Sequence, residues 1–385
     1  MKHLIILAAV VLPCLWDRDT LTIEAKGAPG LVDVLVGRFD RLPREHYAMR
    51  LERVRAELES GAAGAESLAL FDDAAVACDR LGRIDEAIEF MGAKLLALEA
   101  LGEPAKHHRY THLANLGTFH AHRWLAGPRD NPEDLARARD SIARAIELNP
   151  DAHFGRERYQ LLLLEELLEP APAPDHHEAG LPRSIVHRIL GESLVHLPSN
   201  QLAEVGFEDA VEGLSGLVHL GAAWESQLVW TSLADALANR GDAFLARLAA
   251  LRVLELAEAG RTPHADFDAP IYEMNMRATL EDRHVAPLDT WWHQARSSAD
   301  AWRAARNAYA QARYAKGHHP DTHADFWGGW REVHPLPRMP KVLGTDAVNR
   351  RLLVLGVLVL ALLVAGSLWL ARKLLRAIRA PKLPA

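Results

Sequence analysis

Residues 68–101 read LALFDDAAVACDRLGRIDEAIEFMGAKLLALEAL, and this stretch decides the fold. Apolar residues recur at helical spacing on both sides of a short break that contains Gly82 and Asp85. Gly82 ends the first helix, because a residue without a Cβ adopts a left-handed turn at little cost, and Asp85 is placed to start the second helix. Ala87 is small enough to let the two helices approach closely. The stretch therefore predicts a helical hairpin.

A second stretch, residues 227–260, repeats this plan. Its turn glycine, Gly241, and the small residue Ala246 are five positions apart, which is also the separation of Gly82 and Ala87 in the first hairpin. The same order of helix, glycine turn and helix predicts a second hairpin of the same build.

A third hairpin is expected between residues 110 and 150, which end in AIELNP. Its turn glycine is replaced by a longer loop, residues 125–133. A weaker helix pair is expected from residues 183–196 and from a helix that opens at Phe207. These stretches predict three clear repeat units and one degenerate unit.

Around these turns the sequence resembles the tetratricopeptide repeat, a 34-residue helical hairpin with an aromatic residue, a leucine, a turn glycine and a later alanine. The resemblance covers residues 68–260, about half of the chain. It implies an α-solenoid in which stacked hairpins form a concave groove lined by the first helix of every unit. Proteins of this family bind protein or peptide partners in the groove, so the resemblance also implies binding.

The resemblance directs ten polar side chains into that groove, where they would contact a partner; the alternative is that they are merely exposed polar positions. Some family members capture a C-terminal carboxylate with lysine and asparagine. The first unit of this chain has acidic or apolar residues at those positions, which favours a basic or amphipathic ligand. The ten residues are Asp72, Asp73, Asp79, Asn115, Thr118, His122, Thr231, Ser232, Asp235 and Asn239.

The composition predicts the same fold class. Apolar residues make up 49% of the chain and aromatic residues only 6%, while alanine and leucine dominate its middle. Alanine and leucine lose little on entering a helix, whereas strands need more β-branched and aromatic residues. The two cysteines, Cys14 and Cys78, allow no disulfide framework, and Cys78 falls on the apolar face of an expected helix. We therefore expect an all-α protein.

Shifts in composition divide the chain into segments. In order, we expect a signal peptide or short apolar segment at 1–16, an N-terminal region with a capping helix at 17–67, repeats at 68–169, a proline-rich loop or hinge at 170–182, further repeats at 183–260, C-terminal helices at 261–316, a stalk at 317–349, a transmembrane helix at 352–371 and a basic tail at 372–385.

The transmembrane prediction rests on residues 352–371, which are 20 residues without a charge and are bounded on both sides by pairs of basic residues. The apolar start of the chain, after Lys2, has the length and order of a signal peptide. Together they predict a single-pass membrane protein with its body outside the cytoplasm and its basic tail inside. The alternative is a tail-anchored protein whose body faces the cytosol.

Charge separates the expected partners of the body from those of the tail. The net charge is −7, and because residues 349–385 contribute seven cations and no acid, the rest of the chain carries −14. Such a body is repelled by phosphate backbones, so we expect no nucleic-acid partner. The tail suits anionic lipid headgroups.

The sequence contains no recognisable catalytic motif: HExxH, GxSxG, the GxxxxGK[ST] phosphate loop and GxGxxG after a strand are all missing. We expect no catalytic residues, no metal and no cofactor, and the chain is not expected to be an enzyme. The alternative is a metal-dependent or hydrolytic envelope enzyme that uses the densest group of histidines. These histidines are His107, His108, His112, His120 and His122.

The leading hypothesis is a membrane-anchored tetratricopeptide scaffold or adaptor that mediates protein–protein interaction at the cell envelope. A third possibility, a helical assembly factor or transport accessory that acts on lipid or cell-wall components, stays open because fold alone does not define function.

Overall fold

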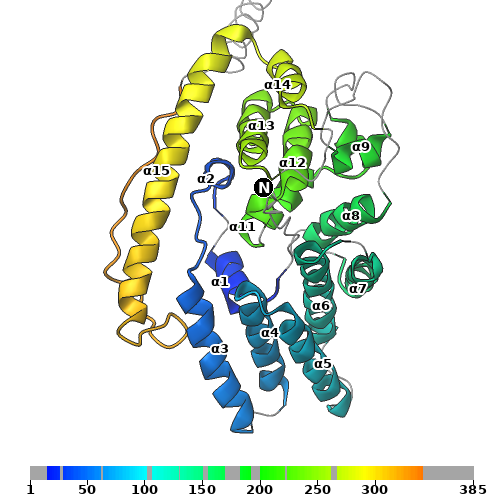
Figure 1. Ribbon diagram of the computed structural model, residues 1–385, viewed down its shortest axis with the longest axis vertical. Coiled ribbons are helices and arrows are strands. Elements are labelled where there is room, and N and C mark those ends of the chain that lie inside the picture. The colour runs from blue at the N-terminus through cyan, green and yellow to red at the C-terminus, as the bar shows by residue number, and fades with distance from the viewer. Residues whose placement is uncertain are drawn as a thin grey trace, which may run out of the picture. The chain divides into compact units, whose positions relative to one another are not determined.

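Every element of regular secondary structure in the described part of the chain is helical (Figure 1). The computed structural model describes residues 15–26, 29–61, 64–101, 106–129, 131–150, 155–169, 183–191, 200–221, 223–261 and 267–340. The all-α prediction is confirmed for these ranges.

The first predicted hairpin consists of α4 (Ala65–Arg80) and α5 (Ile84–Ala100). Gly82 adopts the left-handed conformation, with φ of 78°. The backbone N–H of Arg83 then donates to the carbonyl of Cys78 at 2.8 Å. This bond satisfies a carbonyl that the end of a helix leaves without a partner, which explains why the glycine ends α4.

The second predicted hairpin, α12 (Gln227–Asn239) and α13 (Ala243–Glu258), is built in the same way. Gly241 has φ of 87°, and the N–H of Asp242 donates to the carbonyl of Leu237 at 2.9 Å. The identical spacing in the sequence therefore corresponds to an identical turn in the structure.

Between these hairpins, α6 (Lys106–Ala126) and α7 (Glu133–Leu148) form the third predicted unit. The two helices are in close contact at Gly117, where an added Cβ would lie 2.9 Å from Ile142 Cδ1. Each helix from α3 to α8 packs mainly against its neighbours in the sequence. This is the arrangement of an α-solenoid.

The stack continues from α8 (Arg156–Leu168) to α11 (Ala210–His219), which lies beside α12. Tyr159 of α8 is fully buried against Gly213 of α11, where an added Cβ would come within 2.2 Å of the tyrosine ring. Three short elements pack on these helices: α9 (Ile185–Leu190) on α8, α10 (Gln201–Glu204) on α12, and the 3₁₀ helix η4 (Ala223–Glu225) on α11.

Three helices precede the repeats, namely α1 (Arg18–Lys26), α2 (Leu31–Val36) and α3 (Arg44–Glu59). The N-terminal region at 17–67 was expected to contain a capping helix, and α3 packs on α4 at the start of the repeats. In contrast, α2 packs against α11 and α13, far along the chain. The N-terminal region therefore contacts both ends of the repeat stack.

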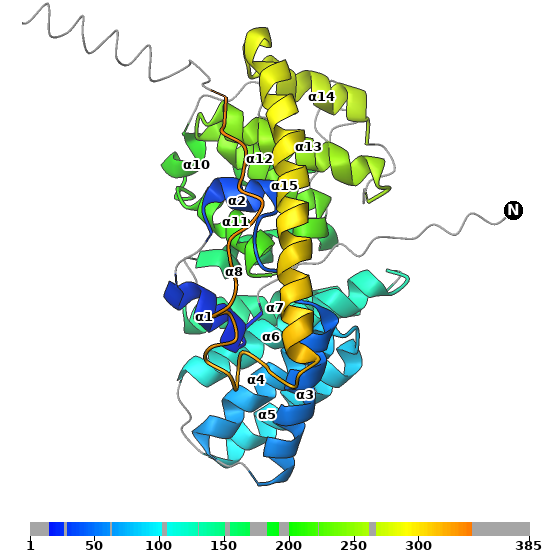
Figure 2. The ribbon, with the colours of Figure 1, turned by 90° about the vertical axis from the view of Figure 1, so that its left-hand side faces the viewer.

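Two helices follow the repeats, α14 (Ala269–Ala278) and α15 (Asp282–Tyr314). The long α15 contacts α2, α3 and α13 (Figure 2). Residues 318–338, expected as part of a stalk, return along α15: Trp291 Nε1 donates to the carbonyl of Pro337 at 3.0 Å, and Ser298 Oγ donates to that of His334 at 2.9 Å.

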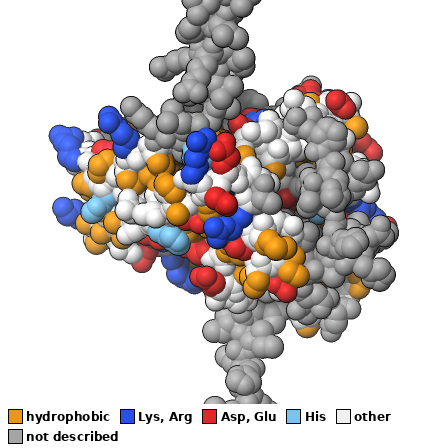
Figure 3. All heavy atoms as spheres, turned by 90° about the horizontal axis from the view of Figure 1, so that it is seen from above, with side chains coloured by type: hydrophobic (Ala, Val, Ile, Leu, Met, Phe, Trp, Pro, Cys, Tyr) orange, Lys and Arg blue, Asp and Glu red, His pale blue; other side chains and the backbone are white. Residues whose placement is uncertain are grey.

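The predicted transmembrane helix and single-pass membrane localisation are not supported and are corrected here. In the part of the chain that the structure describes, no helix is both long enough and apolar enough to cross a bilayer. The longest, α15, has 33 residues but carries charged side chains along its length. Basic, acidic and apolar side chains are likewise mixed on the described face seen in Figure 3. Four segments given roles above lie outside the described residues: 1–14, 170–182, 352–371 and 372–385.

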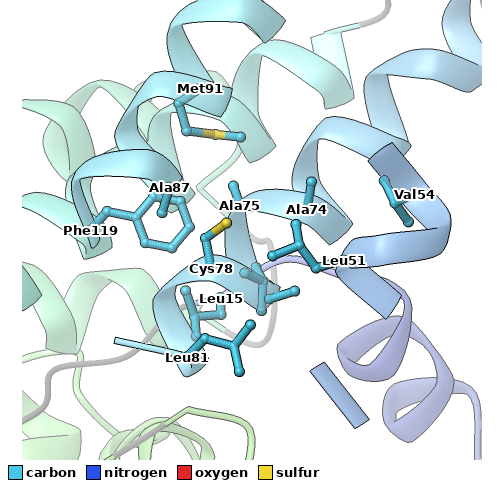
Figure 4. Close-up of a cluster of buried hydrophobic side chains, with 12 residues drawn as sticks. Leu15, Leu51, Val54, Ala74, Ala75, Cys78, Leu81, Ala87, Met91 and Phe119 are labelled. Carbon is cyan, nitrogen blue, oxygen red and sulfur yellow. The ribbon is translucent and has the colours of Figure 1, made fainter. Parts of the chain in front are cut away.

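The core of the first repeat joins α3, α4, α5 and α6 through small and large apolar side chains (Figure 4). Cys78 is fully buried in this cluster, as expected for a small hydrophobic residue, and burial raises the pKa of its thiol to about 11. Leu15, from the segment before α1, packs into the same cluster. The N-terminal segment is therefore part of the repeat core.

Replacing Gly213 with alanine is expected to destabilise the chain by about 1–3 kcal/mol, because the new methyl group overlaps the buried ring of Tyr159. Gly92→Ala is the matched control: it is also a helix-interior glycine, on α5, and no atom lies within 4 Å of the added Cβ. This control should stabilise by roughly 0.5–1 kcal/mol through helix propensity. Urea unfolding followed by circular dichroism measures both, and equal effects would contradict the close contact of α8 and α11.

Candidate functional site

The ten predicted groove residues lie on the inner helices α4, α6 and α12, but they do not line an open groove. All except the half-buried Asp79 are buried. Other segments of the same chain cover them, and the covering segments differ between the first and the second half of the stack. We call the surface of α4 and α6 that carries Asp72, Asp73 and Asn115 the inner face.

On the inner face, the side chain of Asn115 forms hydrogen bonds with both backbone groups of Trp16. The N–H of Trp16 donates to Asn115 Oδ1 at 2.7 Å, and Asn115 Nδ2 donates to the carbonyl of Trp16 at 3.0 Å. Asn115 Nδ2 also donates to Asp72 Oδ1 at 2.9 Å, which fixes the orientation of the amide. A side chain that pairs with both backbone groups of one residue recognises an extended peptide irrespective of its side chains.

The two aspartates of the inner face bind different cations. Asp72 accepts a hydrogen bond from the buried ammonium of Lys94 at 2.6 Å. Burial lowers the pKa of Lys94, and the Asp72 carboxylate opposes this shift. Asp73 accepts hydrogen bonds from both the backbone N–H of Arg18, at 3.0 Å, and its Nε, at 2.6 Å. The inner face thus holds the backbone of Trp16 and both the backbone and guanidinium of Arg18.

The residues on either side of Arg18 are held by a buried arginine of α3. Arg50 is 1% exposed and uses all five of its N–H groups on three carboxylates. Its shortest bonds are 2.7 Å to Asp19 and 2.8 Å to Asp321, with Asp17 at 3.2 Å. This cluster ties α1 to α3 and to the turn after α15.

In the second half of the stack, polar side chains of α12 accept hydrogen bonds from the backbone of α9 and α10. Ser232 Oγ accepts from the backbone N–H of Ile185, and Asn239 Oδ1 accepts from that of Leu202, both at 3.1 Å. Thr231 and Asp235 are buried on the same helix. Ser232 and Asn239, which were predicted to contact a partner, accept from the chain's own backbone at α9 and α10.

The remaining predicted residues, Thr118, His122 and Asp79, form contacts between helices. Thr118 Oγ1 accepts from Gln160 Nε2 at 3.0 Å, and His122 Nδ1 lies 2.6 Å from Asp79 Oδ1. These residues connect α4, α6 and α8 rather than offering free groups to a ligand.

The five histidines of α6 do not converge. His107 is exposed, whereas His112 is buried, and burial lowers its pKa to about 4. His120 and His122 pair with different aspartates, Asp134 and Asp79. Among the residues that the structure describes, no three side chains of His, Cys, Asp or Glu are arranged to hold a metal ion. The described geometry therefore offers no donor set for the metal-dependent alternative.

An array of arginines that no sequence pattern predicted surrounds Trp224. The guanidinium carbons of Arg252, Arg41 and Arg296 lie 4.1, 4.4 and 5.0 Å from the centre of its ring. These residues come from α13, the loop after α2, and α15, so no local spacing in the sequence could reveal the array.

The carboxyl group of Asp17 makes the stability of this region depend on pH. Burial and the nearby charge of Asp19 raise the pKa of Asp17 to about 7, from 3.8 in its ordinary environment, although Arg50 opposes the shift. Since the folded chain holds this proton more tightly than the unfolded chain, the Asp17 contribution to stability falls as the pH rises from about 4 to about 7. Asp17→Asn should therefore gain stability relative to the wild type over this interval.

Asp19→Asn is the control, because the pKa of Asp19 is shifted in the opposite direction to that of Asp17. Although burial raises the pKa of Asp19, hydrogen bonding from His46 and the charge of Arg50 outweigh it and lower the pKa overall. The Asp19 contribution is fully present above the ordinary pKa of 3.8 and is lost only as the pH falls below it, so between about pH 4 and 8 Asp19→Asn should show a nearly constant loss of stability relative to the wild type. Urea unfolding at several pH values from about 4 to 8 tests both variants. Parallel trends in the two variants would contradict the assignment.

The resemblance of the turn sequences to tetratricopeptide repeats stays a prediction from the sequence of this chain. Beyond that resemblance, its inner face is defined by the contacts described above. Comparison with protein-family models, with curated proteins and with solved structures found no match to this chain.

Proposed function

We propose that the chain is a helical-repeat interaction module that binds an extended segment of a partner protein on its inner face, without catalysis of its own. The observation that carries this proposal is the pairing of Asn115 with both backbone groups of Trp16. In this proposal the chain's own N-terminal segment occupies the position of the partner and is displaced by it.

The contacts of that segment define the kind of partner. Asn115 recognises a backbone, Trp16 packs edge-on against Tyr110 with ring centres 5.0 Å apart, and Asp73 receives the guanidinium of Arg18. A competing segment needs an aromatic residue followed two positions later by a basic one. The basic residue agrees with the ligand expected from the acidic residues of the first repeat.

Binding accounts for the polar side chains of the inner face better than catalysis does. Asp72, Asp73 and Asn115 are each engaged in hydrogen bonds or ion pairs with fixed partners. A general base or nucleophile needs a polar atom that reaches a substrate. Side chains that are already paired with backbone and cations are suited to hold a peptide.

A labelled peptide with the sequence of residues 15–26 tests the proposal in fluorescence anisotropy. The receptor is the full chain with Trp16→Ala and Arg18→Ala, which weaken the internal segment. We expect this variant to bind the peptide more tightly than the wild type does. Adding Asn115→Ala should weaken binding by roughly tenfold or more, since two hydrogen bonds of about 1 kcal/mol each are lost.

Asn131→Ala, an exposed loop residue before α7, is the control and should leave binding unchanged. A peptide with glutamate in place of Arg18 should bind less well because it meets Asp73. If the weakened chain does not bind the peptide, or if Asn115→Ala binds it as tightly as Asn131→Ala, the inner face is a structural contact only and the proposal fails.

A further inference from the structure

A cavity of about 240 Å³ lies between α1, the loop joining α2 to α3, and the C-terminal ends of α4 and α11. Leu15, Leu42 and Val76 form the apolar part of the cavity wall. Pockets for drug-sized ligands measure roughly 300–1,000 Å³, whereas a water molecule occupies about 30 Å³ in the liquid. The cavity therefore has room for a small molecule and not for a folded partner.

Three arginines line this cavity: Arg41 and Arg80, which are half-buried, and Arg44, which is exposed. Each donates one hydrogen bond to a backbone carbonyl, at 3.1, 3.3 and 3.0 Å respectively. Within the described part of the chain, none of the three forms an ion pair. The Nε atoms of Arg41 and Arg80 are buried and donate to no acceptor. Most of the hydrogen-bonding capacity of these three groups is unused.

The acidic residues of the same wall do not neutralise these arginines, because each acid already has a cationic partner. Asp17 and Asp19 are bound by Arg50. Asp40 is bound by Arg306, with Nη2 2.9 Å from Oδ2. The acids of the cavity wall are therefore paired with cations other than Arg41, Arg44 and Arg80.

The surroundings of Arg41 increase the positive potential. Burial, followed by the charges of Arg303 and Arg296, lowers the pKa of Arg41 to about 9, and Asp300 offsets only part of this effect. The charge of the half-buried Arg41 is only partly offset, so the folded chain would gain stability from an anion at this position.

His219, at the end of α11, offers a hydrogen-bond acceptor that has no donor. Burial lowers the pKa of His219 to about 4, so the ring is neutral near pH 7. Its Nδ1 lies 2.8 Å from the carbonyl oxygen of Ser215, which can only accept, so Nδ1 carries the proton. Nε2 is then an acceptor, and it is buried without a partner. A ligand beside His219 would satisfy it by donating a hydroxyl proton.

We propose that this cavity is a binding site for a small phosphate monoester that also carries a free hydroxyl group. Arg41, Arg44 and Arg80 would hold the phosphate oxygens, and His219 Nε2 would accept from the hydroxyl. Planar guanidinium groups match the oxygens of a phosphate, and a phosphate dianion offers more charge and more acceptors than a carboxylate.

Isothermal titration calorimetry on the full chain at constant ionic strength tests the site with three probes: glycerol phosphate, inorganic phosphate and lactate. Glycerol phosphate should bind most tightly, inorganic phosphate more weakly and lactate weakest. Bound glycerol phosphate should also raise the melting temperature, because a ligand that binds only the folded state stabilises it. Failure of glycerol phosphate to bind at millimolar concentration would overturn the proposal.

Variants connect binding to the named residues. Arg44→Gln and Arg80→Gln should each weaken glycerol phosphate binding by roughly tenfold or more. Arg109→Gln, an exposed arginine on α6, is the control. His219→Phe, which keeps an aromatic ring but no acceptor, should remove the preference for glycerol phosphate over inorganic phosphate. Equal affinities of the Arg44, Arg80 and Arg109 variants would show that the ion binds elsewhere and would overturn the site.

Discussion

Replacing Arg50 with alanine is expected to lower the free energy of unfolding by about 3–5 kcal/mol. The guanidinium is 1% exposed and donates to Asp17, Asp19 and Asp321. Removing one member of a buried charge cluster leaves the others desolvated and unpaired, which costs more than the intact cluster contributes. Because the cluster joins α1 and the turn after α15 to α3, the loss should also loosen both attachments.

Urea unfolding followed by circular dichroism near pH 7 measures this effect. Arg50→Lys keeps the charge but not the planar fork, so it should recover only part of the stability. Arg109→Ala, at an exposed position, should change the unfolding free energy by less than about 0.5 kcal/mol. The loss in Arg50→Ala should shrink toward pH 4, where the released carboxylates take up protons. A loss smaller than that of Arg50→Lys would contradict this account.

Replacing Trp224 with alanine is also expected to destabilise the chain by about 3–5 kcal/mol. Its ring is 5% exposed and contacts Trp230 edge-on, with ring centres 5.4 Å apart. It also forms the surface over which Arg41, Arg252 and Arg296 lie. The substitution removes apolar burial and leaves three guanidinium groups without the electron-rich face that attracts them.

Trp224→Phe separates these two contributions. Phenylalanine keeps a smaller aromatic face over which the arginines can stack, so its unfolding free energy should fall between those of the alanine variant and the wild type. Urea unfolding of both variants, with Arg109→Ala as the reference, provides the measurement. If Trp224→Phe is as unstable as Trp224→Ala, the volume of the indole and not the cation–π contacts decides the stability of this region.

The hairpins could be predicted because their determinants lie within a few residues. Gly82 and Gly241 adopt left-handed φ values of 78° and 87°. Each turn is closed by a backbone hydrogen bond between two residues that are five positions apart. A glycine between two amphipathic stretches is enough to predict such a turn. The period of apolar residues likewise predicts the buried faces of α4 and α5.

The candidate site could be predicted only in part. The position of Asn115 on an inner helix followed from the repeat pattern, but its occupant, Trp16, is 99 residues away in the sequence. The pattern describes which way a helix faces and contains no information about the segment that covers it. For the same reason, Ser232 and Asn239 were expected to face a partner, whereas they bind the backbone of α9 and α10.

The sequence by itself determined the helical fold class, the two glycine-turn hairpins and the burial of Cys78, since these depend on local backbone preference and on hydrophobic periodicity. Only the tertiary structure decided that the inner face is covered, that Arg50 gathers three carboxylates, and that Arg41, Arg44 and Arg80 share one cavity wall. Such charged and polar groups meet across long stretches of chain. Their pairing depends on which helices pack together, and the packing of the apolar core sets that arrangement.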